Sequence, residues 1–327
     1  MISIAIAILN WNGEKLLRRF LKKVIDNSKE ASIYLIDNAS TDGSVQYVEY
    51  NHPGVKINKL DNNYGYAGGY NRGLNSINED LICLLNNDVL VKSGWLAPII
   101  DHFENHPQTA IAQPHIMDFN QPNQFEYAGA AGGFIDRLGY PYCRGRIFED
   151  LEVDEGQYDK DEKIFWASGA CFFVRKKVFD SLKGFDEDFF AHMEEIDFCW
   201  RAFNQNLSVY SLYRSKVYHL GGGTLKPSSR KTYLNFRNSL FLLLKNLPEK
   251  RFIRIFERMV WDGLAFLFFI LKFNFINAFS VLKSHYSFYL NFQKFNRKHE
   301  ENHEFIHYFK ESFLPLSYFF LKKKKFL

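Results

Sequence analysis

Short apolar runs alternate with a helical pattern over the first part of the chain. Apolar side chains dominate residues 2–9, 33–36 and 81–85 and make up half of residues 55–60, and each run has the length of a strand. Residues 14–27 instead carry apolar side chains at intervals of three and four, the spacing of an amphipathic helix. Strands that alternate with helices in this way predict an α/β fold with a doubly wound, mostly parallel sheet.

Polar side chains follow two of these expected strands. Asn87 and Asp88 come shortly after the fourth strand, and Asp37 follows the second. Open α/β sheets bind ligands at the carboxyl ends of their strands, so Asp88 is a candidate for a metal or phosphate site. Asp37 is a candidate for hydrogen bonding to a nucleobase edge or a ribose hydroxyl. Each has a structural alternative, because Asp88 can form an Asx turn and Asp37 can cap the next helix.

Residues 61–73, after the third expected strand, are rich in glycine. We interpret them as a loop in which glycines such as Gly68 let the backbone approach a bulky ligand. Asn63 and Asn71 can donate hydrogen bonds to phosphate or ribose oxygens. A plain flexible loop is the alternative, and the Gly-Lys-Ser/Thr ending of a Walker loop is absent.

A second group of polar residues lies in a helix expected over 194–203. Glu194 and Glu195 fall in its first turn, where the helix dipole keeps a carboxylate ionised and suits it to act as a general base. The alternative is that acids simply favour first turns. Asp197 and Arg201 are four residues apart, so we expect them to pair on one face.

His219 ends a strand-like run and precedes three glycines. A lone histidine is usually a core residue, but a glycine loop that folds over a diphosphate would make His219 a ligand.

Residues 118–163, which lie between the expected strands and the helix expected over 194–203, lack a regular pattern. Their acidic part, 149–162, predicts a solvated loop or a mobile cover over the site.

Composition narrows the setting of the protein. The 327 residues hold four cysteines, none of them in a CxxC pair, which predicts reduced core thiols and a cytoplasmic protein. Residues 2–9 have no basic flank or cleavage site, so they predict a strand and not a signal peptide. The net charge of +4 divides into +7 after residue 245 and −3 before it. That division argues against nucleic-acid binding and for a local anionic partner.

The segment 248–327 is aromatic and basic. Its longest uncharged apolar run, 263–271, is too short for a transmembrane helix, which needs about twenty residues. We therefore expect helices that lie in a membrane interface, with 319–327 as a polybasic anchor in which each lysine adds about 1 kcal/mol. A helical cap on the catalytic domain with a frayed end is the alternative.

Eight motifs carry a family resemblance. They closely resemble the inverting nucleotide-sugar glycosyltransferases of glycosyltransferase family 2, especially its rhamnosyltransferase-like members, and they occur in family order as ILNWNG, IDNASTDGS, NNYGYAGGYNRG, LLNNDV, WASGACFFVRKKVF, GFDEDFFAHMEEIDFCWR, VYHLGGGT and YLNFRNSL. The resemblance covers residues 1–247 and implies a GT-A fold there, a Rossmann-like doubly wound sheet. It implies transfer of a sugar from dTDP-rhamnose or a UDP-sugar to a hydroxyl. Residues 248–327 are expected to form a helical, membrane-associating appendage, and their basic, aromatic character suits a lipid-linked saccharide acceptor in cell-surface polysaccharide synthesis. The enzyme would then work at the inner face of the cytoplasmic membrane, against an anionic surface.

The resemblance also assigns roles to residues of this chain. Donor binding falls to Asn10, Asp37, Asn63, Gly68, Asn71, Asn87 and Asp88. The sugar or acceptor would contact Trp166 and Gly169. The Asp-x-Asp metal motif of the family corresponds to Asn86-Asn87-Asp88, so Asp88 and His219 would hold Mg²⁺ or Mn²⁺. The base of the family's Glu-Asp motif corresponds to Glu194-Glu195, and we assign proton removal to Glu195.

Two other classes of protein stay open. A nucleotidyltransferase uses a similar sheet, but it is expected to carry a glycine-rich basic loop after the first strand, where this chain has Asn10-Trp11-Asn12-Gly13-Glu14. A non-catalytic nucleotide- or carbohydrate-binding scaffold would need neither Glu195 nor His219.

Overall fold

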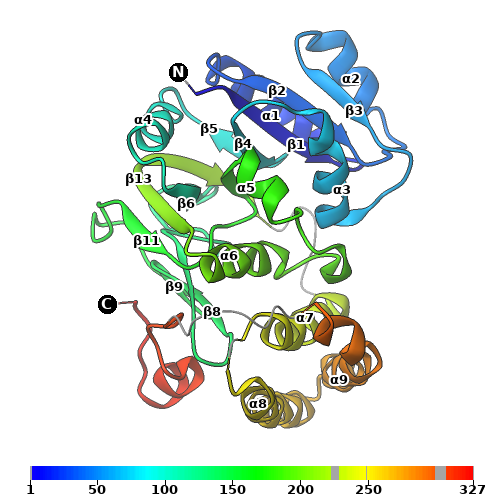
Figure 1. The fold of residues 1–327 in the computed structure, drawn as a ribbon, viewed down its shortest axis with the longest axis vertical. Coiled ribbons are helices and arrows are strands. Elements are labelled where there is room, and N and C mark those ends of the chain that lie inside the picture. The colour runs from blue at the N-terminus through cyan, green and yellow to red at the C-terminus, as the bar shows by residue number, and fades with distance from the viewer. Residues whose placement is uncertain (1, 222–227, 248, 299–306, 327) are drawn as a thin grey trace.

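The computed structural model describes residues 2–221, 228–247, 249–298 and 307–326. Its main feature is a large mixed sheet with the strand order β11-β13-β6-β12-β4-β1-β2-β3, and β5 pairs with β13 (Figure 1). The strands of this sheet are β1 (Ile4–Asn10), β2 (Ser32–Asp37), β3 (Lys56–Lys59), β4 (Leu81–Asn86), β5 (Val89–Val91), β6 (Thr109–Asp118), β11 (Glu162–Ile164), β12 (Cys171–Arg175) and β13 (Ser208–His219). The predicted α/β fold with a mostly parallel sheet is confirmed. Strand β12 runs antiparallel to both of its neighbours.

Two layers of helices cover the sheet because its strands are apolar on both faces. Along β1, Ile4, Ile6 and Ile8 face one buried cluster, and Ala5 and Ala7 face the other. The first cluster includes side chains of α1 (Glu14–Asp26), α2 (Ser44–Asn51) and α4 (Ala97–Asn105). The second includes side chains of α3 (Gly65–Gly73), η1 (Leu74–Ser76), α5 (Lys176–Ser181), η2 (Glu187–Phe189) and α6 (Glu194–Asn204).

The parallel register brings the carboxyl ends of three strands together. Asn10 of β1 pairs with Asp37 of β2, and Leu9 of β1 pairs with Asn86 of β4. The polar residues that follow these strands therefore share one rim of the sheet, as the sequence predicts.

The glycine-rich segment after β3 is mostly a helix, so the loop interpretation was wrong. Helix α3 spans Gly65–Gly73. Its glycines serve close packing: a Cβ at Gly69 would lie 2.8 Å from Leu9 Cδ1, and one at Gly73 would lie 2.5 Å from Ile36 Cδ1. Glycine is needed here for contact with the sheet, and not for backbone flexibility.

Residues 118–163, predicted to be irregular, contain a second, smaller sheet with the order β10-β9-β8-β7. Glu152, in the supposedly solvated acidic part, is buried and accepts a hydrogen bond from the Tyr158 hydroxyl at 3.0 Å. Strands of two or three residues are too short to show an alternating pattern in sequence. They are β7 (Gly133–Ile135), β8 (Pro141–Cys143), β9 (Arg146–Ile147) and β10 (Asp150–Leu151).

The C-terminal part forms a helical layer beyond α6 (Figure 1). It consists of α7 (Ser229–Asn246), α8 (Arg251–Leu271), α9 (Phe275–Asn296) and the one-turn η3 (Leu316–Phe320). Among the helices that the structure describes, none has both the length and the apolar character required to cross a bilayer. All four cysteines are buried and free, in line with the expected reduced thiols.

The last described residues pack back onto the smaller sheet. The Phe326 ring lies 5.2 Å from that of Phe134, and Lys324 pairs with Asp150 at 3.3 Å. Phe319, Phe320 and Leu321 are nevertheless 66–72% exposed. Both the polybasic anchor and the cap with a frayed end therefore stay predictions; Leu327 lies outside the described residues. The domain boundary at residue 247 stays a prediction.

Candidate active site

Asn10 and Asn87 connect the ends of the central strands. Asn87 Nδ2 donates to Asn10 Oδ1 at 3.0 Å, and Asn10 Nδ2 donates to Ser40 Oγ at 3.2 Å. A Cβ at Gly13 would lie 2.3 Å from Asn10 Oδ1, so glycine is required beside this pair. Because these side-chain amides already form hydrogen bonds within the protein, their first role is to hold the strand ends at this rim of the sheet in place.

Asp37 offers a buried carboxylate oxygen at this rim. Its Oδ2 accepts a hydrogen bond from the Ser40 backbone N–H at 3.1 Å, whereas Oδ1 is buried without a hydrogen-bond partner. A buried acceptor without a partner costs free energy unless a ligand or water satisfies it. Asp37 Oδ1 is therefore suited to receive a donor group of a nucleoside.

Asn38 is a site residue that the sequence reading missed. Its Nδ2 donates to Asn63 Oδ1 at 3.0 Å and to the Gly65 carbonyl at 2.9 Å, and its Oδ1 accepts from the Tyr64 N–H at 3.0 Å. Asn38 thus holds the turn into α3, and Asn63 is part of this clamp. The signal was present, since Asn38 directly follows Asp37.

His219 and Asp88 lie side by side because of strand pairing. His219 of β13 pairs with Val89 of β5, the residue after Asp88. His219 Nε2 lies 3.1 Å from Asp88 Oδ1, and His219 Nδ1 lies 3.3 Å from Glu126 Oε1. All three side chains are buried. Burial alone would lower the pKa of His219, but the carboxylates of Asp88 and Glu126 outweigh it and raise that pKa to about 10.

Glu126 is a second residue that the sequence reading missed. It lies in the stretch predicted to be irregular, and no motif marks it. Its Oε2 accepts a hydrogen bond from the Ala128 backbone N–H at 2.6 Å, which fixes the carboxylate against His219 Nδ1. Carboxylates that contact the second nitrogen of a histidine ligand orient its ring toward a metal.

The Asp88 and His219 pair fits a divalent ion that is shared with a ligand. Asp88 Oδ1 and His219 Nε2 lie 3.1 Å apart, and a carboxylate oxygen and an imidazole nitrogen are both groups that bind divalent ions in proteins. Within the described residues, no three acidic, histidine or cysteine side chains are grouped to hold an ion by themselves. The remaining ligands would have to come from a bound diphosphate. The glycines expected to fold over it, Gly222 and Gly223, lie outside the described residues.

Glu194 and Glu195 begin α6, and their environments differ. Glu194 is 5% exposed, and burial and the neighbouring Glu195 hold its pKa well above the ordinary value. Glu195 is half-buried, and burial raises its pKa to about 7, against the opposing effect of nearby backbone N–H groups. Burial raises both pKa values, so adjacent carboxyls here favour a state in which one is protonated beside the other. Glu195 is the better suited of the two to accept a proton at neutral pH.

The segment that leads into α6 has an unusual backbone. Phe190, His192 and Met193 have φ angles of 67°, 69° and 73°, a region that non-glycine residues avoid. Asn238 of α7 holds this segment: its Nδ2 lies 2.7 Å from the His192 carbonyl and 2.9 Å from that of Ala191. Hydrogen bonds from Asn238 of α7 therefore stabilise this strained backbone, which directly precedes Glu194 and Glu195.

Contacts connect the glutamates with the rim of the sheet. The Tyr66 hydroxyl donates to the Gly169 carbonyl at 2.8 Å, and the neighbouring Ala170 carbonyl accepts from the Asn86 N–H at 3.0 Å. Burial raises the pKa of Tyr66 well above its usual value, and Glu194 and Glu195 lie close enough to add to that shift.

A second link runs through the smaller sheet. Burial raises the pKa of the Cys143 thiol, and Glu126 and Glu195 both lie close enough to contribute to that shift. Direct contacts also lead from the metal pair toward α6. Asn86 Nδ2 lies 3.4 Å from His219 Nε2, and the Tyr66 ring lies 5.8 Å from that of Phe185, which in turn lies 5.3 Å from the Phe198 ring of α6.

Three other predicted residues have mainly structural contacts. Asn71 Nδ2 donates to the Phe185 carbonyl at 2.8 Å, and its Oδ1 accepts from the Phe185 N–H at 2.9 Å. Trp166 is 4% exposed, and its indole N–H donates to the Phe134 carbonyl at 2.9 Å. A Cβ at Gly68 would lie 2.9 Å from Tyr64 Cβ, so this glycine serves packing within α3. Gly169, in contrast, lies against Tyr66: a Cβ there would lie 2.7 Å from the Tyr66 hydroxyl.

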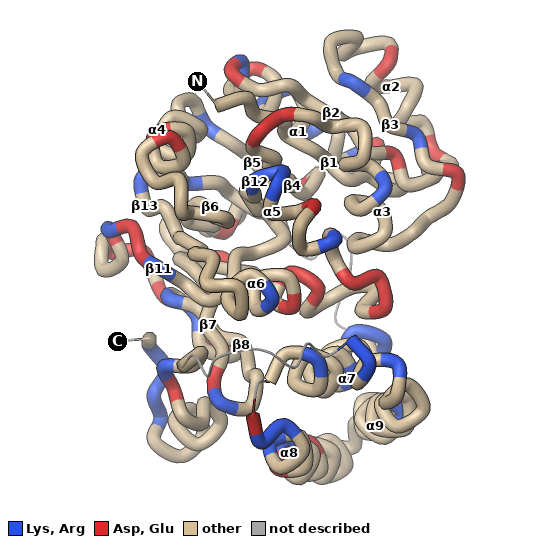
Figure 2. Tube along the Cα trace, in the orientation of Figure 1, with Lys and Arg blue, Asp and Glu red and all other residues tan. Residues whose placement is uncertain are grey.

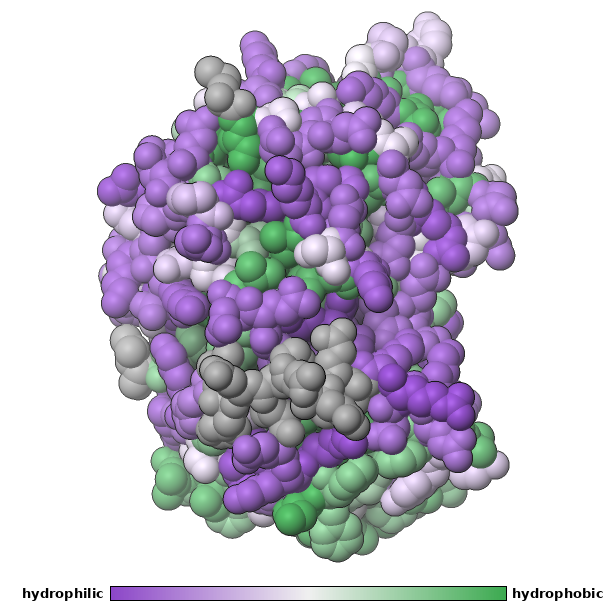
Figure 3. All heavy atoms as spheres, viewed as in Figure 1, coloured by the Kyte–Doolittle hydropathy of each residue, from purple (hydrophilic) through white to green (hydrophobic). Residues whose placement is uncertain are grey.

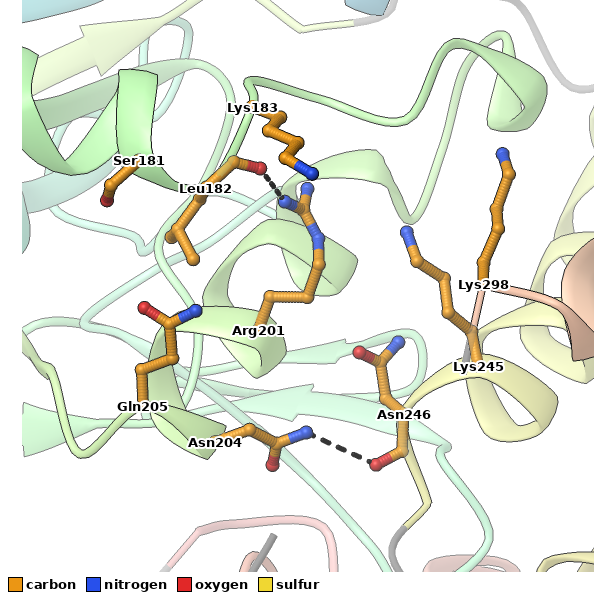
Figure 4. Close-up of a pocket in the computed structure, with 9 residues that line it drawn as sticks. All are labelled: Ser181, Leu182, Lys183, Arg201, Asn204, Gln205, Lys245, Asn246 and Lys298. Carbon is orange, nitrogen blue, oxygen red and sulfur yellow. Dashed lines mark hydrogen bonds between the residues drawn. The ribbon is translucent and has the colours of Figure 1, made fainter. Parts of the chain in front are cut away.

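A small polar pocket lies apart from this site, between α6 and the end of α7 (Figure 4). Arg201 pairs with Asp197 at 2.8 Å, which confirms the predicted pairing, and Lys245 pairs with Asp197 at 2.8 Å. Lys298 pairs with Asp186 at 2.8 Å. The cations that line the pocket are thus largely neutralised by acids, and we interpret it as the joint between α6 and the C-terminal helices.

Comparison with known proteins agrees with this geometry. The curled, mostly parallel sheet with helices on both faces is the fold of GT-A glycosyltransferases. The chain belongs to glycosyl transferase family 2, whose model matches residues 3–183. It is a glycosyltransferase with the GT-A fold, as the resemblance implied.

Two relatives and one solved structure show how far the likeness extends. The chain is 27% identical over 228 residues to the N-acetylglucosaminyl-diphospho-decaprenol L-rhamnosyltransferase of Mycobacterium tuberculosis, which covers 64% of this chain and 73% of that protein. It is 25% identical over 261 residues to the low-salt glycan biosynthesis hexosyltransferase Agl10 of Haloferax volcanii. That alignment covers 77% of this chain and 78% of that protein. The structure of GalNAc-T7 with UDP, GalNAc and Mn²⁺ superposes with a TM-score of 0.60 and 15% identity, over 77% of this chain and 49% of that chain. This chain therefore spans about half the length of GalNAc-T7, and that likeness shows the fold.

Proposed function

We propose that this glycosyltransferase moves a sugar from a nucleoside diphosphate donor, dTDP-rhamnose or a UDP-hexose, to a hydroxyl of a lipid-linked saccharide, with inversion at the anomeric carbon. The observation that carries the proposal is the buried pair of Asp88 and His219 beside Asn86, at the carboxyl end of β4. The relative from Mycobacterium tuberculosis supports the choice of substrates, because its name describes rhamnosyl transfer to a diphospho-decaprenol acceptor.

In this mechanism each group has one task. Asp37 Oδ1 receives a donor group of the nucleoside. Asp88 and His219 would hold Mg²⁺ or Mn²⁺, which when bound neutralises the charge that develops on the leaving diphosphate. The Glu195 carboxylate takes the proton of the acceptor hydroxyl while that oxygen bonds to the anomeric carbon and the bond to the diphosphate breaks. The products are the extended saccharide and a nucleoside diphosphate.

A lipid-linked acceptor places the reaction at a membrane surface. We therefore propose peripheral attachment of the enzyme to the inner face of the cytoplasmic membrane, with anionic lipid as its partner there. The basic character of the chain after residue 245 supports this setting.

A donor screen tests the proposal. The full chain is mixed with Mn²⁺ and a panel of dTDP- and UDP-sugars, and the thermal unfolding midpoint is measured, since a ligand that binds only the folded state raises it. We expect one donor to raise the midpoint and to release its nucleoside diphosphate when a saccharide acceptor is added. A scaffold would bind without release. A nucleotidyltransferase would instead release pyrophosphate from a nucleoside triphosphate and a sugar phosphate.

A further inference from the structure

Helices α8 and α9 present a large apolar surface to solvent. Most of the exposed large hydrophobic side chains among the described residues lie between residues 252 and 290. On α8 they recur at intervals of three and four, so they form one stripe along the helix: Phe252, Phe256, Val260, Leu264, Leu267 and Leu271. Figure 3 shows this surface as the green lower edge of the molecule, where Figure 1 places α8 and α9.

A second stripe runs along α9, which packs against α8. Its exposed members also recur at three and four residues, and they are Ile276, Phe279, Leu282, Tyr286 and Tyr289. The buried side of α9, with Val281 and Phe288, belongs to the core. Folded domains rarely leave a contiguous apolar patch of this kind in water, so the α8–α9 face needs a partner.

The charges on these helices indicate the chemistry of that partner. The sequence from 251 to 296 contains two acidic residues, Glu257 and Asp262. Glu257 pairs with Arg137 at 2.8 Å, and Asp262 pairs with Arg258 at 2.8 Å. Lys272 and Lys283 are exposed. The other basic residues of this stretch, in blue in Figure 2, are Arg251, Arg254 and Arg258 at the start of α8 and Lys294 near the end of α9. The α8–α9 face is therefore apolar and cationic, with both of its carboxylates neutralised.

We propose that the α8–α9 face docks on an anionic phospholipid bilayer, with the two helices lying in the interface and their apolar stripes below the headgroups. Amphipathic helices with aromatic side chains and cations bind membranes in this way. A second copy of the chain would bring like cations together without carboxylates to pair with them, which disfavours self-association. The inference deepens the proposed function, since it rests on a lipid-linked acceptor and assigns the surface that meets the lipid.

Ion pairs join this surface to the segment that carries the base. Lys294 of α9 pairs with Asp188 at 2.6 Å, and Lys298 pairs with Asp186 and Asp188 at 2.8 and 2.6 Å. These aspartates lie shortly before Glu194. Docking through α9 therefore holds the entrance to α6 in a fixed position relative to the membrane.

Vesicle binding of the full chain tests the inference without any sugar donor. Sedimentation is measured with phosphatidylcholine vesicles, alone or with about 30% phosphatidylglycerol. We expect at least about tenfold tighter binding to the anionic vesicles, and a loss of at least about tenfold in the variant Phe256→Glu/Leu264→Glu/Leu271→Glu. The matched control is Tyr50→Glu, which changes a side chain that is 88% exposed on α2. That control is expected to bind like the wild type.

A second variant, Lys272→Gln/Lys283→Gln, keeps the apolar stripes and is expected to lose most of the preference for anionic vesicles. Unchanged binding of both variants, or no binding by the wild type, would overturn the inference. So would a dimer that the triple variant converts to a monomer while vesicle binding persists, because a second copy would then cover the face. Release of nucleoside diphosphate with a water-soluble acceptor is measured in parallel. If that release persists while vesicle binding is absent, the docking inference and the proposed membrane attachment fail and the proposed sugar transfer stands.

Discussion

The side-chain nitrogen of Asn238 lies 2.7 Å from the carbonyl oxygen of His192, and this contact joins α7 to the strained entrance of α6. His192 and Met193 keep positive φ angles directly before Glu194 and Glu195. Each such residue costs about 1–3 kcal/mol, so the segment persists only where other contacts determine it. Asn238 is fully buried and provides those contacts. It is a positioning residue for the proposed base.

Replacing Asn238 by alanine should lower kcat at least about tenfold and leave the KM for donor within about twofold, because the base moves while the donor site is untouched. The matched control is Asn246→Ala, since Asn246 is 3% exposed on the same helix and its amide donates to Asp197 instead. Both variants should lose about 1–3 kcal/mol of unfolding free energy. Equal kcat values for the two variants would contradict the positioning role.

Glu195→Gln should reduce turnover at least about 10²-fold with nearly unchanged donor binding, because only proton transfer is lost. Wild-type kcat/KM should rise with pH through about 7 as Glu195 ionises, since burial raises its pKa to about 7. The variant should lose that rise. A wild-type rate in Glu195→Gln would show that another group is the base.

The pH dependence of the unfolding free energy offers a second test of the Glu195 carboxyl. This free energy should fall as pH rises, whereas kcat/KM should rise. The folded-state pKa of Glu195 is raised to about 7, above its ordinary value, so the folded chain binds more protons than the unfolded chain between those values. This group therefore makes the unfolding free energy fall as pH rises toward 7. Glu195→Gln should reduce that fall, which denaturant unfolding at pH 5 and pH 8 would measure. Identical pH profiles for the two proteins would contradict the buried, protonated state.

Replacements of the residues around the proposed metal site should differ in how far they lower activity and metal affinity. Asp88→Asn and His219→Ala should remove most activity, and chelation followed by Mn²⁺ or Mg²⁺ should inactivate and restore the wild type. Glu126→Gln should weaken metal affinity about 10–100-fold without removing it, because Glu126 orients the His219 ring and does not face Asp88. Metal titrations of donor binding would measure this order. An effect of Glu126→Gln as large as that of Asp88→Asn would refute the orienting role.

The strand pattern and the polar strand ends predicted most of the parallel sheet and the position of Asp37 and Asp88 on its rim, because both follow from local sequence. Contacts between distant segments were not readable. Glu126 lies in a stretch of very short strands, and its partner His219 is in β13. The glycines of α3 suggested a loop that approaches a ligand, whereas in the fold Gly69 and Gly73 allow close contact with Leu9 and Ile36. The role of such residues depends on their neighbours in the folded protein, which local sequence does not reveal.

The contacts of Trp166 in the folded protein also differ from the role that the resemblance implied. The resemblance placed it against the sugar or acceptor, but its indole packs on Gly133, where a Cβ would lie 2.1 Å from the ring, and donates to the Phe134 carbonyl. Trp166→Phe should therefore lower the unfolding free energy by about 1–3 kcal/mol, because it leaves that carbonyl unsatisfied. The KM for acceptor should stay within about twofold of the wild type. Since a residue that stacks on sugar would change the KM more than the stability, an acceptor titration beside a denaturant unfolding curve separates the two roles.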